Sequence, residues 1–393
     1  MATTRATKSG LLIMTMSSSL VLACGEQPGG DADEGEGETQ TESVGSEESS
    51  GSSEAGSSTE DTSAGDSESS ESDESESAQS SESDESESEA STGEDPPALC
   101  PEGLDGQVPS LDGLAFELVA SPPEDGYAEG FEILEGPVWI DGALHVSHIA
   151  GGGPPPKARI LRLEGDALVE VLATAGSNGL AVDDQGQLVA ARHEDGSVST
   201  YAIDELDAAP QVWISEYEGA RFNSPNDLVI SSAGVLYFTD PDWQAPSPAP
   251  QAAERAYYVL PGADAAVAFA EEVAKPNGVV LSLDEAKIYV GGTEGLFAYA
   301  LAADGSVGAG GQVDSVAGGG FDGTAKDCAG NLYFAANGQV MVVTPDEQVY
   351  GSLSLANVTN LAFGGPDGTT LYATTLNQAG VYAVELGVPG FPY

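Results

Sequence analysis

A repeat with six copies constrains the fold of this chain more than any other feature of its 393 residues. Each copy has a polar residue, a short apolar strand, a turn rich in Gly and Asp, and a second strand such as LYF, IYV or LYA. The leading polar residues, at spacings of 43, 48, 51, 45 and 38, are Glu135, Asn178, Asn226, Asn277, Asp322 and Asn360. Blades of about 40–50 residues built from short strands are typical of β-propellers. We therefore predict an all-β, six-bladed β-propeller.

The register of these polar residues predicts a site in the central channel. The innermost strand of each blade lines the channel, so equivalent positions in the six inner strands lie on one ring. Asn and Asp are depleted in strands, and a single one would be explained by a turn. Six in register instead favour a ring of oxygen ligands. Such ligands suit a hard cation such as Ca²⁺, which takes 6–8 oxygens at about 2.3–2.6 Å.

The charge of the chain excludes one class of partner. The chain has 65 acidic and 11 basic residues, a net charge of −54. A polyanion does not bind nucleic acid through a basic surface, and charge does not draw it to anionic lipid. We expect a monomer that binds a small-molecule substrate.

The first 23 residues have the features of an export signal. Arg5 and Lys8 precede an apolar segment at 10–23 that is short for a membrane span. The segment ends in Ala23-Cys24, which resembles the lipobox of bacterial lipoproteins. This resemblance implies that 1–23 is a lipoprotein signal peptide and that Cys24 is lipidated. We expect a lipid-anchored protein of the bacterial cell envelope, at the outer membrane, either periplasmic or surface-exposed. The membrane would be contacted only through the lipid anchor.

Residues 24–97 are predicted to be a disordered Ser/Glu/Asp-rich tether, and residues 98–393 the folded domain. Residues 26–95 hold 25 acidic residues and no Lys or Arg. Such a segment has almost nothing apolar to bury, and its like charges repel. Cys100 and Cys328 remain after Cys24 is assigned to lipidation. Export to an oxidising compartment allows a disulfide between them, and two independent buried thiols are an equal alternative.

The folded part resembles the SMP-30/gluconolactonase/LRE-like family of six-bladed propellers. The resemblance runs from about Leu111 to the C-terminus. Its carriers are EGPVW at 135–139, NSPND at 223–227, YFTDP at 237–241, PNG at 276–278, DG at 322–323 and NLAFGG at 360–365. Three positions differ from the usual family pattern: Phe321 stands in place of Pro, Gly291-Gly292 in place of a Ser-Asp-like pair, and His148 in place of Asp.

The resemblance implies one divalent metal ion in the channel, most simply Ca²⁺, with Zn²⁺ or Mg²⁺ as alternatives. The implied ligands are Glu135, Asn226, Asn277 and Asp322, and Asp322 is also the implied catalytic base. We expect Asn178, Arg221 and Trp243 to bind substrate. A solvent-exposed role for Arg221 is equally consistent with the sequence, and a structural role is favoured for His193.

The predicted activity is a gluconolactonase-type hydrolase that opens a lactone or a similar ester ring. Two alternatives stay open. One is a phosphotriesterase-like hydrolase, since the same oxygen ring can serve that chemistry. The other is a non-catalytic cell-surface propeller that uses channel Ca²⁺ for rigidity.

Overall fold

The computed structural model describes residues 100–128, 130–151, 153 and 155–391. All of the described residues belong to one compact unit. The predicted signal peptide, Cys24 and the tether therefore lie outside the described residues.

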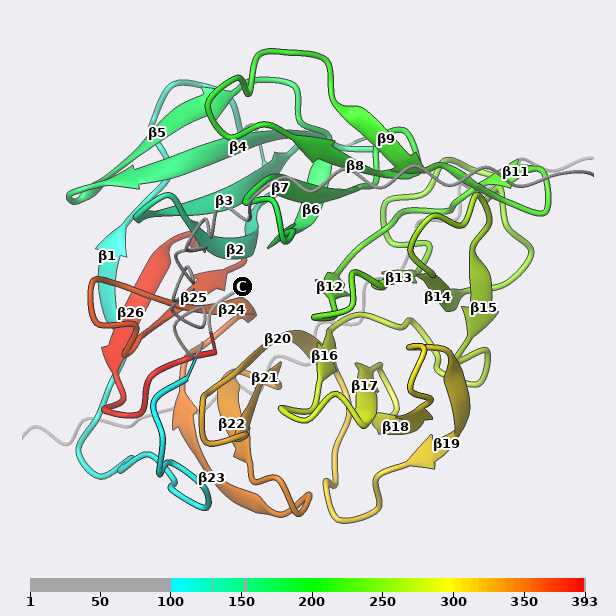
Figure 1. The fold of residues 1–393 in the computed structure, drawn as a ribbon. Helices are drawn as coiled ribbons and strands as arrows, with labels where there is room; N and C mark the ends of the chain where they lie inside the picture. The colour runs from blue at the N-terminus through cyan, green and yellow to red at the C-terminus, as the bar shows by residue number, and fades with distance from the viewer. Residues whose placement is uncertain (1–99, 129, 152, 154, 392–393) are drawn as a thin grey trace, which may run out of the picture. The chain divides into compact units, whose positions relative to one another are not determined.

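The described part of the chain forms six four-stranded antiparallel sheets arranged around a centre, as Figure 1 shows. The predicted all-β, six-bladed propeller is confirmed, and the described ranges contain no helix. Accordingly, no helix there could cross a membrane.

In five blades the strands follow the order of the chain from the centre outwards. The first blade has β2 (Glu132–Ile140), β3 (Ala143–Ala150), β4 (Lys157–Glu164) and β5 (Ala167–Leu172). The second has β6 (Ser177–Val182), β7 (Leu188–Arg192), β8 (Ser197–Tyr201) and β9 (Gln211–Ile214), followed by a small hairpin of β10 (Glu216–Tyr217) and β11 (Ala220–Arg221).

The third blade has β12 (Leu228–Ile230), β13 (Leu236–Asp240), β14 (Arg255–Val259) and β15 (Val267–Phe269). The fourth has β16 (Val279–Leu281), β17 (Lys287–Gly291), β18 (Leu296–Leu301) and β19 (Val307–Gln312). The fifth has β20 (Phe321–Lys326), β21 (Leu332–Ala336), β22 (Gln339–Val343) and β23 (Val349–Ser354).

The sixth blade closes the ring with a strand from the other end of the domain. Its inner strands are β24 (Val358–Gly364), β25 (Thr370–Thr375) and β26 (Val381–Glu385), and its outer strand is β1 (Glu117–Ala120). Glu117 pairs with Ala383 and Leu118 with Tyr382. In Figure 1 the cyan β1 lies beside the red β26. Backbone hydrogen bonds between the two ends of the domain therefore hold the propeller closed.

The hydrophobic core lies between the blades. Each blade packs a face against the next, which gives a separate apolar cluster at each of the six interfaces. At the closing interface, Leu134 and Val146 of the first blade pack against Ala362 and Val381 of the sixth. The alternation of apolar residues along each strand supplies both faces.

The segment before β1 is attached to the fifth blade. Cys100 forms a disulfide with Cys328, with a Cα–Cα distance of 5.4 Å across 228 residues of sequence. Nearby, Asn331 Nδ2 donates a 2.8 Å hydrogen bond to Gln107 O. The sequence left open a disulfide or two independent buried thiols, and the structure has the disulfide.

Candidate functional site

The six leading polar residues lie at the start of the inner strands. Glu135, Asn178, Asp322 and Asn360 are in β2, β6, β20 and β24, while Asn226 and Asn277 come just before β12 and β16. We call this end of the channel the ring end. The opposite end, where each inner strand turns into the second strand, is the turn end.

Glycines place the ring residues side by side. Gly follows the ring residue in four blades, and a Cβ there would collide with the next inner strand. It would lie 2.3 Å from Asn178 O at Gly136, 2.6 Å from Asn226 O at Gly179, 2.0 Å from Asp322 O at Gly278 and 1.9 Å from Asn360 Cγ at Gly323. Only a residue without Cβ allows this approach. The four contacts follow the order of the blades, so the six positions form a ring as predicted.

The two blades without this glycine use side chains instead. Asp227 follows Asn226, and its Oδ2 accepts a 3.3 Å hydrogen bond from Val279 N in the fourth blade. Asn360 Nδ2 donates a 3.2 Å hydrogen bond to Glu135 Oε2. The Asn360 side chain also lowers the pKa of Asp227, against the larger effect of burial. Sequence reasoning placed Asn360 in the ring but assigned no role to Asp227. The signal for Asp227 was its place in NSPND, where most copies of the repeat have Gly.

The carboxylates of the ring come from alternate blades. Glu135, Asp227 and Asp322 belong to the first, third and fifth blades, and amides from Asn178, Asn277 and Asn360 come from the blades between them. The Asn277 side chain favours the ionised form of Asp322 and so lowers its pKa, against the larger effect of burial. Glu135, Asn226 and Asp227 are buried, whereas Asn277 and Asp322 are partly exposed. The arrangement gathers negative charge at the channel axis and leaves Asp322 accessible.

Burial raises the pKa of each of these carboxyls, and repulsion between carboxylates adds to this effect for Glu135 and Asp322. Burial, with the charges of Asp322 and Asp227, holds the pKa of Glu135 well above its usual range. Burial and the Asp227 charge raise the pKa of Asp322 to about 8, and burial raises the pKa of Asp227 to about 7. In the described part of the chain no Lys or Arg forms an ion pair with any of the three.

The ring has the donor chemistry of a hard-cation site. Carboxylate and amide oxygens without a protein counter-charge favour a bound cation, because the cation relieves the repulsion. Asn178 Oδ1 is also buried without a hydrogen-bond partner. Among the described residues, no three or more His, Cys, Asp or Glu are gathered as a metal cluster. The predicted set differs from such a cluster because it combines two carboxylates with two amides.

Arg221 lies at the ring end but is held by backbone. Its guanidinium donates to Phe222 O at 3.1 Å, Glu194 O at 3.3 Å and His193 O at 3.1 Å. These contacts join the segment before NSPND to the second blade. Its predicted role in substrate binding stays a prediction, as does that of the buried Asn178.

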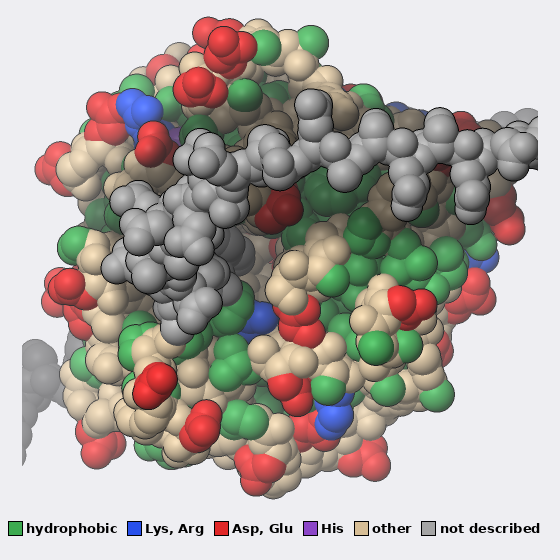
Figure 2. All heavy atoms as spheres, viewed as in Figure 1, with side chains coloured by type: hydrophobic (Ala, Val, Ile, Leu, Met, Phe, Trp, Pro, Cys, Tyr) green, Lys and Arg blue, Asp and Glu red, His purple; other side chains and the backbone are tan. Residues whose placement is uncertain are grey.

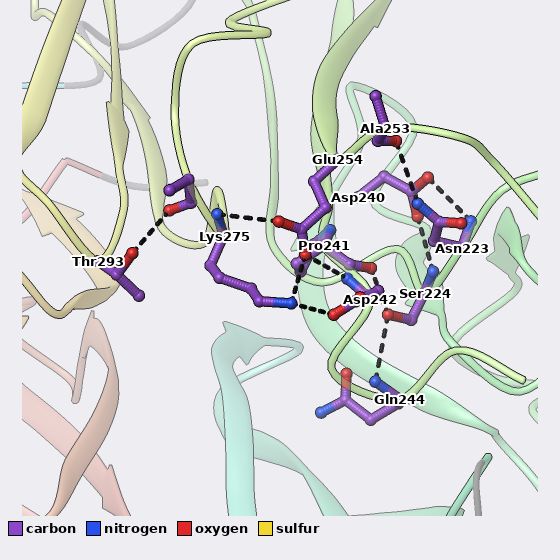
Figure 3. A network of polar contacts seen from close by, with 11 residues as sticks. Asn223, Ser224, Asp240, Pro241, Asp242, Gln244, Ala253, Glu254, Lys275 and Thr293 are labelled. Atoms are coloured by element: carbon purple, nitrogen blue, oxygen red, sulfur yellow. Dashed lines mark hydrogen bonds and ion pairs between the residues drawn. The ribbon is translucent and has the colours of Figure 1, made fainter. Parts of the chain in front are cut away.

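Trp243 lies on a loop at the ring end and is 50% exposed. Figure 3 shows how this loop is fixed between the NSPND motif and the segment before Asn277. Asp240 accepts backbone hydrogen bonds from Asn223 at 2.9 Å and Ser224 at 2.7 Å. Lys275 pairs with Asp242 and, at 2.7 Å, with Glu254, and its Nζ lies 5.0 Å from the Trp243 ring centroid. The YFTDP motif thus orders the chain around Asn226, and Trp243 keeps an open face.

The histidines have structural contacts. His193 is fully buried, and its Nε2 lies 2.9 Å from Pro156 O. His148 contacts Glu132 at 2.8 Å and accepts a 3.1 Å hydrogen bond from the buried Arg159. His148 therefore belongs to a polar network with Glu132 and Arg159, and none of its printed contacts is to a ring residue.

The fold and the site define a class of protein: a six-bladed propeller with a ring of carboxylates and carboxamides at one end of its channel. The family described as SMP-30/Gluconolactonase/LRE-like region matches residues 133–377. The chain belongs to this family.

Relatives agree with this assignment. A gluconolactonase from Zymomonas mobilis subsp. mobilis is 28% identical over 277 residues, which are 63% of this chain and 75% of the relative. The solved gluconolactonase XC5397 from Xanthomonas campestris is 26% identical, with a TM-score of 0.57 and coverage of 67% of this chain and 88% of that one. A solved protein described only provisionally as a gluconolactonase is 24% identical, with a TM-score of 0.60 and coverage of 72% and 95%.

Proposed function

We propose that this protein is a divalent-metal-dependent lactonase of the gluconolactonase type, acting at the ring end of the channel. The observation that carries the proposal is the ring itself, in a chain of this family. Three carboxylates face one axis without a counter-charge among the described residues, and the partly exposed Asp322 stands beside the partly exposed Asn277. Gluconolactonase relatives support a lactone as the substrate.

Glu135, Asn226, Asn277 and Asp322 would hold the metal ion. When bound, a divalent cation polarises an ester carbonyl and stabilises the negative charge that develops on its oxygen. Ca²⁺ is the favoured ion because the donors are all oxygens. Zn²⁺ sites usually include His or Cys, and His148 and His193 have other contacts, so Zn²⁺ ranks lower. Mg²⁺ also takes oxygen ligands, but it demands near-ideal octahedral geometry and usually keeps several waters, so it ranks below Ca²⁺.

Asp322 is the proposed general base. It is partly exposed, so a water molecule can reach it, and a bound cation would keep it as the carboxylate that can accept a proton. The Asn277 side chain favours the ionised form of Asp322. Asp322 would take a proton from the water as its oxygen forms a bond to the carbonyl carbon. It would return this proton to the ring oxygen as the ring C–O bond breaks, which leaves a carboxylic acid and a hydroxyl group.

Substrate binding is assigned to side chains around this end. Trp243 offers an exposed aromatic face for a sugar-like ring, and Asn178 has an unpaired buried oxygen that can accept a hydrogen bond. Arg221 would position the backbone carbonyls to which its guanidinium donates, and the edge of the guanidinium would contact the substrate. These are proposals for each residue, with Trp243 the most accessible of the three.

The proposal is tested by a panel of lactones, aryl esters and phosphotriesters assayed with Ca²⁺, Mg²⁺ and Zn²⁺. We expect lactones to be the preferred substrates, and a chelator to abolish turnover until Ca²⁺ is restored. If phosphotriesters are turned over faster than lactones, the protein is a phosphotriesterase-like hydrolase instead. Ca²⁺ binding with no turnover of any panel member would favour a binding protein.

We further propose that the protein is a lipid-anchored monomer of the bacterial cell envelope. The disulfide Cys100–Cys328 supports export, since such bonds persist in oxidising compartments. Metabolic labelling with a tritiated fatty acid, compared between the natural chain and Cys24→Ser, tests the anchor. Equal labelling of both would contradict it.

A further inference from the structure

A second hollow lies on the turn-end side of the ring. It is a cavity of about 540 Å³ whose walls come from the parts of the inner strands that follow the ring residues. Its inner end reaches Asp227 and Asn360, and its outer end is formed by the first turns of the blades and by Phe391. A cavity of this size is within the range that accommodates small ligands. Figure 2 shows a hollow at the centre of the propeller, on the face that Figure 1 also shows.

The walls of this cavity are mainly apolar. Leu180, Leu228, Val280 and Leu361 come from four different blades and face the same space. Polar groups lie at its two ends: Asp227 and Asn360 inside, and charged residues of the turns outside. A ligand that fits would need an apolar body with a polar end.

Lys326, at the end of β20, is the basic residue that lines the cavity. It forms no ion pair with any carboxylate among the described residues. Its Nζ lies 4.1 Å from the centroid of the Phe391 ring. Burial lowers the pKa of Lys326 to about 8, against a weaker opposing effect of Glu285. A half-buried ammonium that lies against an aromatic ring and forms no ion pair among the described residues favours an added anion.

The acidic residues at the outer end already have partners. Glu285 accepts hydrogen bonds from Ser232 N and Ser232 Oγ, both at 2.8 Å. Asp183 accepts from Gln185 N at 2.9 Å and Gln187 N at 2.8 Å, within its own turn. These contacts hold both carboxylates in the turns, so neither serves as the counter-ion of Lys326. Their charge, together with that of Asp184, disfavours a ligand with several negative charges.

We propose that the turn end of the channel is a second small-molecule site, which binds a monocarboxylate with an apolar body. The carboxylate would pair with Lys326 Nζ, and the body would lie against Phe391 and the apolar wall between Leu228 and Val280. This site is separate from the catalytic site proposed above. It uses no residue that we assign to metal or substrate binding.

The probe is octanoate, measured by titration calorimetry on the full chain with its disulfide intact. We expect a Kd below about 1 mM, since a ligand of this size gains only a few kcal/mol from burial and one ion pair. Octanol is the neutral control and should bind at least about 10-fold more weakly, because it lacks the charge-assisted hydrogen bond.

The variant Lys326→Met keeps the length of the side chain and removes its charge. We expect it to weaken octanoate binding by about 10-fold or more and to leave octanol binding within about twofold. Lys287→Met is the matched control, because Lys287 pairs with Glu347 at the same end without lining the cavity, and it should bind octanoate normally. Lactone turnover should be unchanged in both variants.

Two results would overturn the proposal. One is octanoate binding that survives in Lys326→Met when that variant has the thermal stability of the natural chain. The other is competition between octanoate and the lactone substrate, which would place the probe at the ring end. Should Lys326→Met fail to fold, protection of Lys326 from acetic anhydride by octanoate, read by peptide mass spectrometry, decides the question. Lack of protection then rejects the site. The octanoate titrations and the acetylation test do not depend on the lactonase assay succeeding.

Discussion

The two ends of the channel are built from the same six inner strands and have opposite chemistry. At the ring end, Glu135, Asp227 and Asp322 gather negative charge beside amides, and glycines bring their backbones into contact. At the turn end, a few residues further along the same strands, the wall is apolar and the one lining cation is Lys326. The comparison shows that the position of a residue along the inner strand decides whether it lies in the polar ring or in the apolar wall of the cavity. One scaffold can therefore carry two independent sites.

The largest effect should come from the ring end. Asp322→Asn removes the proposed base and one charge, so we expect lactone turnover to fall by about 10²–10⁴-fold. Asn277→Ala should weaken the metal but leave the base, so excess Ca²⁺ should restore part of its activity. Turnover is measured against Ca²⁺ concentration for both variants, with thermal melting as the check on folding. If Ca²⁺ rescues Asp322→Asn as fully as Asn277→Ala, Asp322 is only a ligand.

A second prediction separates the two ends by stability. The disulfide attaches the N-terminal segment to Cys328, just after Lys326 at the turn end. Replacing Cys100 and Cys328 together by Ala should lower the free energy of unfolding by about 2–4 kcal/mol. Turnover at 25 °C should stay within about twofold, because the ring residues keep their contacts. Urea denaturation measures the first quantity, and a large loss of turnover in a folded variant would contradict the independence of the ends.

Buried histidines at both ends should make stability depend on pH. Burial lowers the pKa of His193 at the ring end, and of His145 at the turn end, to about 4. The unfolded chain takes up these protons near pH 6.5, before the folded chain does. The stabilisation is therefore fully present above pH 6.5 and is lost as the pH falls toward 4, by up to about 3 kcal/mol for His193.

The measurement is the free energy of unfolding between pH 7.5 and 4.5 for His193→Gln and His145→Gln. Each variant should have a shallower loss than the natural chain over this range, whatever its absolute stability. Raised pKa values at the ring carboxyls act in the opposite direction, so the difference between chains is the informative quantity. Parallel curves for natural chain and variants would show that the folded chain protonates these histidines as easily as the unfolded one.

The smallest expected effect concerns the loop that presents Trp243. Lys275→Met removes the contacts to Asp242 and Glu254, which are partly exposed and therefore modest. We expect KM for the lactone to rise by about two- to fivefold, with kcat unchanged. Lys287→Met, which breaks an exposed pair at the turn end, is the control and should leave KM unchanged. A fall in kcat without a change in KM would mean that the loop positions the catalytic groups instead of the substrate.

The amino-acid sequence by itself determined the number of blades and the ring. Both follow from local signals: strands defined by alternating apolar residues, turns defined by Gly and Asp, and a polar residue at a constant place before each inner strand. Because a propeller repeats one unit around an axis, the same place in each repeat must lie at the same height in the channel. Glu135, Asn178, Asp322 and Asn360 could therefore be placed from spacing alone.

Only the tertiary structure decided what depends on neighbours distant in the chain. The pairing of Glu117 with Ala383, and the bridge between Cys100 and Cys328, bring together segments more than 200 residues apart, and no local pattern specifies either. Asp227 reads in the sequence as a turn residue after Asn226. The structure places it in the ring: it occupies the position that is Gly in four other blades, and its carboxylate accepts a hydrogen bond from the fourth blade. The proposed role of Lys326 in binding a carboxylate likewise depends on the cavity around it. Whether a lysine is buried or paired is decided by the residues that surround it in the fold, and its own sequence position does not reveal them.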